Sequence, residues 1–356
     1  MPRHRRSAGA DAAGLIAAAG VAALLACPVA ARGQALRGNV RAAETKAPLP
    51  YSTVVLDPGF SGRFTDDSGY FAFAALASGT YRLVVRAIGF VPFDTMIAVP
   101  GGAPIVLHIG LLPLAFELPP VTVIGMRTCL RPGPPAADSE PELAAIFDEL
   151  RETAARYRLL SDAYPFKYWL ERRVWDDPPP PHGEALAMDT MELRSNVRRR
   201  YTPGGLLELQ AGPRGRLERM LRVPTLVDLA DSIFHKAHCF AFAGIDTIDG
   251  RSQIRVDFLA AERLRAPDVA GSAWLDAETY VLRRLTFRLT RPERALATVK
   301  SLDVTVAFGE LLPSVTVPTR IAATSEAARG PRRGLTGYEE QRLLRVEFLR
   351  APPGVP

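Results

Sequence analysis

Apolar and polar residues alternate in short runs along much of the chain, and turn residues separate the runs. Alternation with period two buries one side of a run and exposes the other, as in a half-buried β-strand. Such runs follow one another from residue 36 to about residue 125, with turns such as Asp57-Pro58-Gly59 between them and a last strand expected over Leu118 to Ile124. Seven or so strands at this spacing predict a seven-stranded β-sandwich.

A helical period follows a proline-rich stretch. Leu143, Ile146 and Leu150 begin a series of apolar residues spaced by three and four, which predicts a helix. Pro141 suits the first turn of that helix because proline is tolerated where the backbone N–H has no partner.

Strand-like runs return from Tyr164 to Phe348, and one short helix is expected among them over Leu226 to His238. We therefore expect a mainly β protein with a signal peptide at its N-terminus and two folded domains. The expected divisions are a signal peptide at 1–35, a β-sandwich at 36–125, a Pro-rich linker at 126–140 and an α+β antiparallel-sheet domain at 141–350.

The N-terminal residues have the organisation of a secretory signal peptide. The basic stretch Arg3-His4-Arg5-Arg6 precedes an apolar run from Ala12 to Ala26, which is too short to span a bilayer comfortably. A lipid anchor at Cys27 is the alternative, although Leu25 fits a lipoprotein processing site poorly. Processing is expected after Ala26, Ala31 or Ala35.

No later segment offers 18 uninterrupted apolar residues, so we expect no transmembrane helix in the mature chain. The expected location is therefore outside the cytoplasm, in the periplasm or associated with the outer membrane.

Export changes the interpretation of the cysteines, because disulfides persist in oxidising compartments. If Cys27 leaves with the signal peptide, Cys129 and Cys239 remain. We expect them to form a disulfide, with two separate buried thiols as the alternative. A bridge over so long a loop would stabilise the fold by about 4–5 kcal/mol in the chain-entropy model.

The net charge of +6 raises the question of a nucleic-acid partner. Four arginines against Asp11 in the first 35 residues already account for +3 of this charge. The densest later cluster, Arg198-Arg199-Arg200, lacks the repeated basic and aromatic pattern of a nucleic-acid surface. We therefore expect a solvated charged surface and no nucleic-acid partner.

Two motifs of the first predicted domain are distinctive, Thr65-Asp66-Asp67-Ser68-Gly69-Tyr70-Phe71 and Gly79-Thr80-Tyr81. With Gly38 before them and Ile88-Gly89-Phe90 after them, they resemble the carboxypeptidase regulatory-like domain. That family is a transthyretin-like β-sandwich, placed among carbohydrate-binding-like folds and found ahead of the plug in many TonB-dependent receptors. The resemblance covers about a quarter of the chain and implies an envelope protein with an accessory, non-catalytic module.

The physical role of these motif residues is structural. Asp66 and Gly69 are expected to make a hairpin turn, since glycine adopts positive φ without strain. Phe71 and Phe73 should share the buried face of the next strand, with Tyr70 on the other face. An exposed aromatic residue such as Tyr70 could alternatively stack on a sugar.

The stretch from Gly271 to Leu285 predicts a strand, a turn centred on Asp276 and a second strand. It resembles the hairpin repeated in lipoprotein-carrier-like half-barrels, and the resemblance implies a curved antiparallel sheet wrapped round a helix. Trp274 alternates with Ala273 and Leu275, and we expect it in the core.

Reactive residues are sparse. His235, His238 and Cys239 could contribute to a zinc site, but we favour a packed helix end with a disulfide. No His-x-x-Glu pair of a zinc carboxypeptidase is present, and neither is a nucleophile elbow or a phosphate-binding loop. We expect no catalytic residues, no metal ligands and no cofactor.

The leading functional expectation is a non-catalytic, exported envelope protein that binds or scaffolds a glycan or another envelope protein. A periplasmic carrier of a lipid or other apolar ligand is the alternative, and a hydrolase with an unrecognised site is the third. A carrier should have a wide dry cavity lined by residues such as Phe147, Phe287 and Phe308. A filled core in the second domain would favour the binding protein instead.

Overall fold

The fold was analysed in a computed structural model that describes residues 34–58, 60–113, 128–176, 183–197, 199–211, 217–328, 336–350 and 352. The apolar run of the predicted signal peptide, the processing sites after Ala26 and Ala31, Cys27 and the predicted strand from Leu118 to Ile124 lie outside these residues. Ala35 lies inside the first strand.

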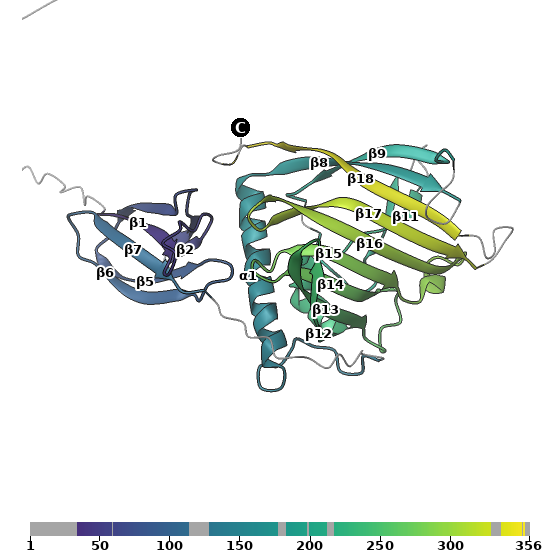
Figure 1. The fold of residues 1–356 in the computed structure, drawn as a ribbon, viewed down its shortest axis with the longest axis horizontal. Coiled ribbons are helices and arrows are strands. Elements are labelled where there is room, and N and C mark those ends of the chain that lie inside the picture. Colours follow the sequence, from purple (N-terminus) through teal and green to yellow (C-terminus); the bar gives the residue numbers. More distant parts are fainter. Residues whose placement is uncertain are drawn as a thin grey trace, which may run out of the picture.

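Seven strands form the N-terminal β-sandwich, as predicted (Figure 1). One sheet has the order β4-β1-β7 and the other the order β3-β2-β5-β6. Only the β1–β7 pair is parallel among the pairs of these two sheets. The strands are β1 (Gln34–Ala42), β2 (Thr53–Asp57), β3 (Phe60–Phe64), β4 (Tyr70–Leu76), β5 (Gly79–Arg86), β6 (Phe93–Val99) and β7 (Ile105–Leu111).

The alternation in β4 has the predicted result. Phe71 and Phe73 are 2% and 1% exposed in the sandwich core, whereas Tyr70 is 40% exposed. The turn before β4 is closed by Asp66, whose carboxylate accepts hydrogen bonds from the backbone N–H groups of Ser68 and Tyr70. Gly69 has φ +76°, and a Cβ there would lie 2.4 Å from a backbone oxygen, so the turn requires glycine.

The C-terminal part combines one long helix with a nine-stranded antiparallel sheet of order β12-β13-β14-β15-β16-β17-β18-β8-β9. In Figure 1 the helix α1 lies across the direction of these strands, and the sheet twists along its length. The elements are α1 (Pro141–Ala163), β8 (Phe166–Trp175), β9 (Ala187–Arg194), β10 (Leu207–Ala211), β11 (Leu217–Leu221), α2 (Leu226–Leu229), α3 (Ser232–Ala237), β12 (His238–Ile248), β13 (Arg251–Ala260), β14 (Val269–Asp276), β15 (Leu282–Leu289), the 3-10 helix η2 (Pro292–Arg294), β16 (Val299–Leu312), β17 (Val315–Ala327) and β18 (Thr336–Phe348).

The predicted single helix over Leu226 to His238 is wrong in detail, because two short helices occupy this segment. Thr225 caps α2 in a capping box with Asp228, and the carboxylate of Asp231 accepts a hydrogen bond from the N–H of Ile233 to begin α3. The two aspartates therefore start separate helices. His238 is already the first residue of β12.

The main core lies between α1 and one face of the sheet. Leu143, Ile146, Phe147 and Leu150 of the helix are each at most 3% exposed and share one cluster with residues of β12 to β17. The same helix turns Leu160 toward a second cluster, which contains Tyr51 of the sandwich. The helix thus packs against both domains.

A small contact region, which we call the seam, joins the sandwich to α1 and the β14–β15 turn. Arg86 pairs with Glu152 at 3.0 Å, and Arg156 donates to the backbone oxygen of Arg86 at 3.3 Å. A Cβ on Gly89 would lie 2.5 Å from the backbone oxygen of Glu278. The two parts therefore meet at backbone contact distance.

Candidate functional site

The two faces of the large sheet differ in chemistry. Phe258, Phe287 and Val304 alternate onto the face that packs against α1 and belong to the main core. Their neighbours along each strand project to the opposite face. Residues paired in register share a face, and one such row is polar or small throughout. This row is Asp257, Ser272, Thr286, Thr305 and Ala322, from β13 to β17 in order.

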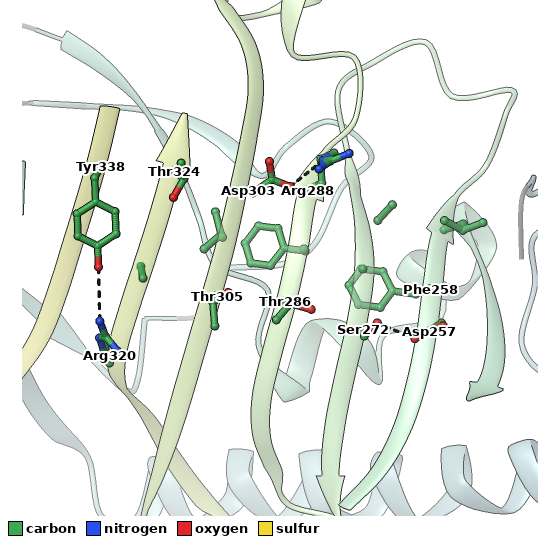
Figure 2. Close-up of a pocket in the computed structure, with 16 residues that line it drawn as sticks. Asp257, Phe258, Ser272, Thr286, Arg288, Asp303, Thr305, Arg320, Thr324 and Tyr338 are labelled. Carbon is green, nitrogen blue, oxygen red and sulfur yellow. Dashed lines mark hydrogen bonds and ion pairs between the residues drawn. The ribbon is translucent and has the colours of Figure 1, made fainter. Parts of the chain in front are cut away.

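This row forms the floor of an open hollow of about 750 Å³, which we call the trough (Figure 2). On one side Arg288, Asp303 and Tyr338 rise beside the floor, and on the other side Arg320 does so. Short side chains flanked by long ones create a depression that crosses the strands. The trough therefore lies on the sheet face away from the core.

Free hydroxyl groups line the trough. Ser272 donates to the carboxylate of Asp257 at 2.6 Å. The hydroxyls of Thr286, Thr305 and Thr324 have no side-chain hydrogen bond within the described residues, although each lines the trough. A hydroxyl both donates and accepts, so these three groups can pair with a polar ligand.

Ion pairs hold the long side chains that border the trough. Arg288 pairs with Asp303 at 2.7 Å, and Arg320 pairs with Glu340 at 2.6 Å. Burial by itself would raise the pKa of the Glu340 carboxyl, but hydrogen bonds from Arg320 and Arg342 outweigh this effect. The pKa of Glu340 therefore lies below its ordinary value, and the carboxylate stays charged at neutral pH.

Aromatic side chains stand at one end of the trough. The ring of Tyr338 stacks on Trp175 with ring centres 5.6 Å apart, and the Tyr338 hydroxyl lies 3.5 Å from Arg320 (Figure 2). Trp274 also faces this side of the sheet, in register with Arg255 and Arg284. The expectation that Trp274 belongs to the core is wrong, because its neighbours Ala273 and Leu275 take the buried face instead.

The space between the sheet and α1 is occupied by side chains. Phe147, Phe287 and Phe308, the residues expected to line a carrier's cavity, are 3%, 3% and 9% exposed and lie in one cluster. Phe147 also packs edge-on against Phe240, with ring centres 4.7 Å apart. This arrangement is that of a packed core.

The cysteine and histidine residues singled out from the sequence are not among the residues that line the trough. A disulfide joins Cys129 to Cys239, with Cα atoms 5.5 Å apart. Both rings bond to backbone oxygens, His235 to Leu229 at 2.7 Å, and His238 to Phe234 at 2.9 Å. Over the described ranges, no three His, Cys, Asp or Glu side chains are grouped so as to hold a metal ion.

A buried carboxylate lies beside His238. Asp268 is fully buried and accepts hydrogen bonds from the Tyr201 hydroxyl at 2.6 Å and the Gly204 N–H at 3.1 Å. Burial would raise the pKa of Asp268, but the bonds from His238, Tyr201 and Gly204 lower it below its ordinary value. These groups fasten the segment before β10 to the core.

The trough residues were not singled out from the sequence, apart from Phe287 as a cavity residue. The polar side chains of the trough are ordinary Ser, Thr, Asp and Arg residues that alternate with core residues along their strands. A local signal does exist in β15, where Arg284, Thr286 and Arg288 alternate on one face. Only the pairing of six strands brings such residues into one row.

No described helix combines the length and the apolar composition needed to cross a membrane.

A comparison with known protein families agrees with the resemblance of the first domain. The carboxypeptidase regulatory-like domain family matches residues 35–112, which confirms the assignment of the sandwich. No curated protein matches the chain.

Three solved structures are similar to parts of this chain, each with a TM-score below 0.5. A type II cohesin–X-dockerin complex from Acetivibrio cellulolyticus is 21% identical with a TM-score of 0.19, over 22% of this chain and 56% of that one. A LolA superfamily protein from Nitrosomonas europaea is 14% identical with a TM-score of 0.29, over 58% and 94%. A putative carbohydrate binding protein from Bacteroides uniformis is 9% identical with a TM-score of 0.20, over 89% and 99%. Residues 35–112 of the chain thus match the carboxypeptidase regulatory-like domain family.

Proposed function

We propose that the chain is an exported, non-catalytic binding protein of the cell envelope, and that the trough binds a glycan. In this proposal the sandwich is an accessory domain and the antiparallel-sheet domain carries the ligand. The observation that carries the proposal is the trough itself, a polar hollow of about 750 Å³ on the exposed face of the sheet.

The chemistry of the trough supports a polyhydroxylated ligand. Three threonine hydroxyls without side-chain partners can exchange hydrogen bonds with sugar hydroxyls. Charged groups fixed by ion pairs, such as Arg288 with Asp303, offer further directed contacts. The open form and the orientation across the strands suit an extended chain of sugars.

The packing on the other face of the sheet favours this proposal over a lipid carrier. An acyl chain needs an apolar cavity, and the phenylalanines expected to line it are packed against one another and against α1. A carrier would have to displace this core to accept a lipid.

A binding test uses the full chain and an array of envelope and cell-wall oligosaccharides, followed by calorimetric titration of the best binder. Thr286→Val and Thr305→Val keep the side-chain shape and remove one hydroxyl each. We expect each to weaken binding about threefold to tenfold, which is the range for one hydrogen bond. Thr190→Val, on the exposed face of β9 outside the trough, is the matched control and should bind as the parent does.

Absence of binding to every oligosaccharide would contradict the proposal. The competing hypothesis, a lipid carrier, predicts that the protein retains a lipid of defined mass. Native mass spectrometry of protein isolated from the periplasm would detect such a lipid. Equal affinities of the two trough variants and the parent would place the glycan elsewhere on the molecule.

A further inference from the structure

Arginines form a second row beside the floor of the trough. Arg255, Trp274, Arg284, Ala307, Arg320 and Arg342 are successive partners in register from β13 to β18. Each lies two residues along its strand from a residue of the floor row or from Glu340, so both rows share one face of the sheet. We call Arg255, Arg284, Arg320 and Arg342 the arginine row.

The charges in the three rows that make up and flank the floor do not cancel. Over the arginine row, the floor row with Glu340, and the row of Arg288, Asp303 and Tyr338, five arginines stand against three carboxylates, an excess of two positive charges. The arginines are Arg255, Arg284, Arg288, Arg320 and Arg342, and the carboxylates are Asp257, Asp303 and Glu340.

The excess is localised by the ion pairs. Arg255 is paired with Asp257 at 2.9 Å. Arg320 and Arg342 share the single carboxylate of Glu340, at 2.6 and 3.0 Å. Arg284 has no carboxylate partner within the described residues. The uncompensated charge therefore lies at Arg284 and around Arg320.

Trp274 fixes the guanidinium of Arg284. The guanidinium carbons of Arg284 and Arg255 each lie 5.5 Å from the centre of the Trp274 ring, a cation–π distance. The indole N–H of Trp274 donates to Asp246 at 2.7 Å, which fixes the ring itself. The free cation is thus held in place before any ligand arrives.

The two uncompensated positions lie close together on the sheet. Arg284 and Arg320 are separated in the row only by Ala307, which is exposed. Strands are about 4.8 Å apart, so the two arginines flank a gap of roughly 10 Å whose floor is a methyl group. A carboxylate or sulfate above Ala307 can be reached by guanidinium groups from both sides.

We propose that the ligand of the trough is an anionic glycan, with a carboxylate or sulfate bound between Arg284 and Arg320 above Ala307. This inference rests on the proposed function, because it names the class of glycan that the same site takes. The sugar hydroxyls meet the threonines of the floor, and the acid groups meet the arginine row.

The test compares three probes by calorimetric titration against the full chain. Hexagalacturonate carries sugars and carboxylates, its methyl ester keeps the sugars without the charge, and hexaglutamate carries the charge without sugars. We expect hexagalacturonate to bind at least tenfold more tightly than either of the others.

Variants locate the contact. Arg284→Gln and Arg320→Gln should each weaken hexagalacturonate binding about tenfold, and the affinity should depend less on salt than in the parent. Arg82→Gln removes an exposed arginine of the sandwich, which pairs with Asp94, and should change nothing. Thermal denaturation of each variant checks that the fold persists.

The outcomes separate the two proposals. Equal binding of hexagalacturonate and its methyl ester overturns the anionic class and leaves glycan binding intact. Binding of hexaglutamate as tight as that of hexagalacturonate overturns the glycan in favour of an acidic polypeptide. Loss of affinity in the Arg82 variant equal to that in the arginine-row variants overturns the location. If the protein binds none of the three probes and no other oligosaccharide, both proposals are removed together.

Discussion

Glu149 illustrates how the fold sets the charge of one residue. It lies on α1 close to the seam, half-buried among charged neighbours. Burial raises the pKa of this carboxyl to about 7, Glu152 adds to the rise, and Arg156 and Arg86 oppose it. The folded protein therefore holds this proton more tightly than the unfolded chain, whose glutamates titrate near 4.5.

The sign of the resulting pH dependence follows from linkage. A raised folded pKa contributes stability that is complete below pH 4.5 and is lost as the pH rises to about 7. Glu149→Gln stays neutral and avoids this loss. We expect the variant to exceed the parent in free energy of unfolding by about 1–2 kcal/mol at pH 8, after allowance for solvent screening, and to match it at pH 4.

Urea denaturation from pH 4 to pH 8 measures this difference. Glu140→Gln removes an exposed glutamate just outside α1 and serves as the control, with no comparable gain expected at pH 8. Parallel pH curves for the parent and the Glu149 variant would show that the carboxyl has no raised pKa.

Among the elements, the disulfide has the widest reach. Cys129 lies before α1 and Cys239 lies in β12, and 110 residues separate them. The closed loop contains α1, strands β8 to β11 and both short helices. The bond therefore ties the start of the long helix to the edge strand of the nine-stranded sheet.

Loss of this bond should be costly. The double substitution Cys129→Ser, Cys239→Ser should lower the free energy of unfolding by about 4–5 kcal/mol, as expected for a loop of this length in the chain-entropy model. Guanidinium denaturation of the parent with and without reductant gives the comparison. A reductant-insensitive parent would contradict the expected contribution.

The elements were largely predictable from the sequence, and the trough was not. Period-two alternation identified the strands, and the spacing from Leu143 identified α1, because both signals are local. The break between α2 and α3 escaped prediction because Asp228 completes the capping box of α2 and Asp231 caps α3, while both aspartates also suit the first turns of one longer helix. The trough depends on register, and alternation alone says nothing of which residues become cross-strand neighbours.

The same limitation explains the error at Trp274. An aromatic residue between Ala273 and Leu275 can take either face of a strand. Its size favours burial, but the small Ala273 and the fully buried Leu275 occupy the core face, and the indole is left beside two arginines. At this position the alternation along the strand determines the face of the side chain, and the residue type does not.

At the scale of the whole molecule, α1 connects two domains rather than serving one. One part of its surface packs in the main core, and Leu160 packs with Tyr51 of the sandwich. The ion pair between Arg86 and Glu152 lies in the same seam. We therefore expect the two domains to keep a fixed arrangement.

A glycine at the seam offers a test of this arrangement. Gly89→Ala would place a methyl group 2.5 Å from the backbone oxygen of Glu278, where neither backbone yields without separating the domains. Gly250→Ala is the matched control, since Gly250 has the same φ of +74° as Gly89 and nothing within 4 Å of its Cβ position. Both variants carry the backbone strain of an alanine at positive φ, roughly 1–2 kcal/mol.

Only the Gly89 variant should also loosen the seam. We expect its radius of gyration, measured by small-angle X-ray scattering, to increase while its circular dichroism stays unchanged. Identical scattering curves and equal shifts in melting temperature for the two variants would mean that the seam does not fix the domains.

Because the trough crosses the strands, its structure affects how its ligand preference could change in evolution. Each strand contributes a single outward side chain to each row that crosses the sheet, and the alternate side chains of that strand belong to the opposite, packed face. In the proposed glycan complex, exchange of one outward residue would change the contacts to about one sugar. The packed face of the sheet would stay as it is. The ligand preference of such a surface can therefore change by one substitution at a time.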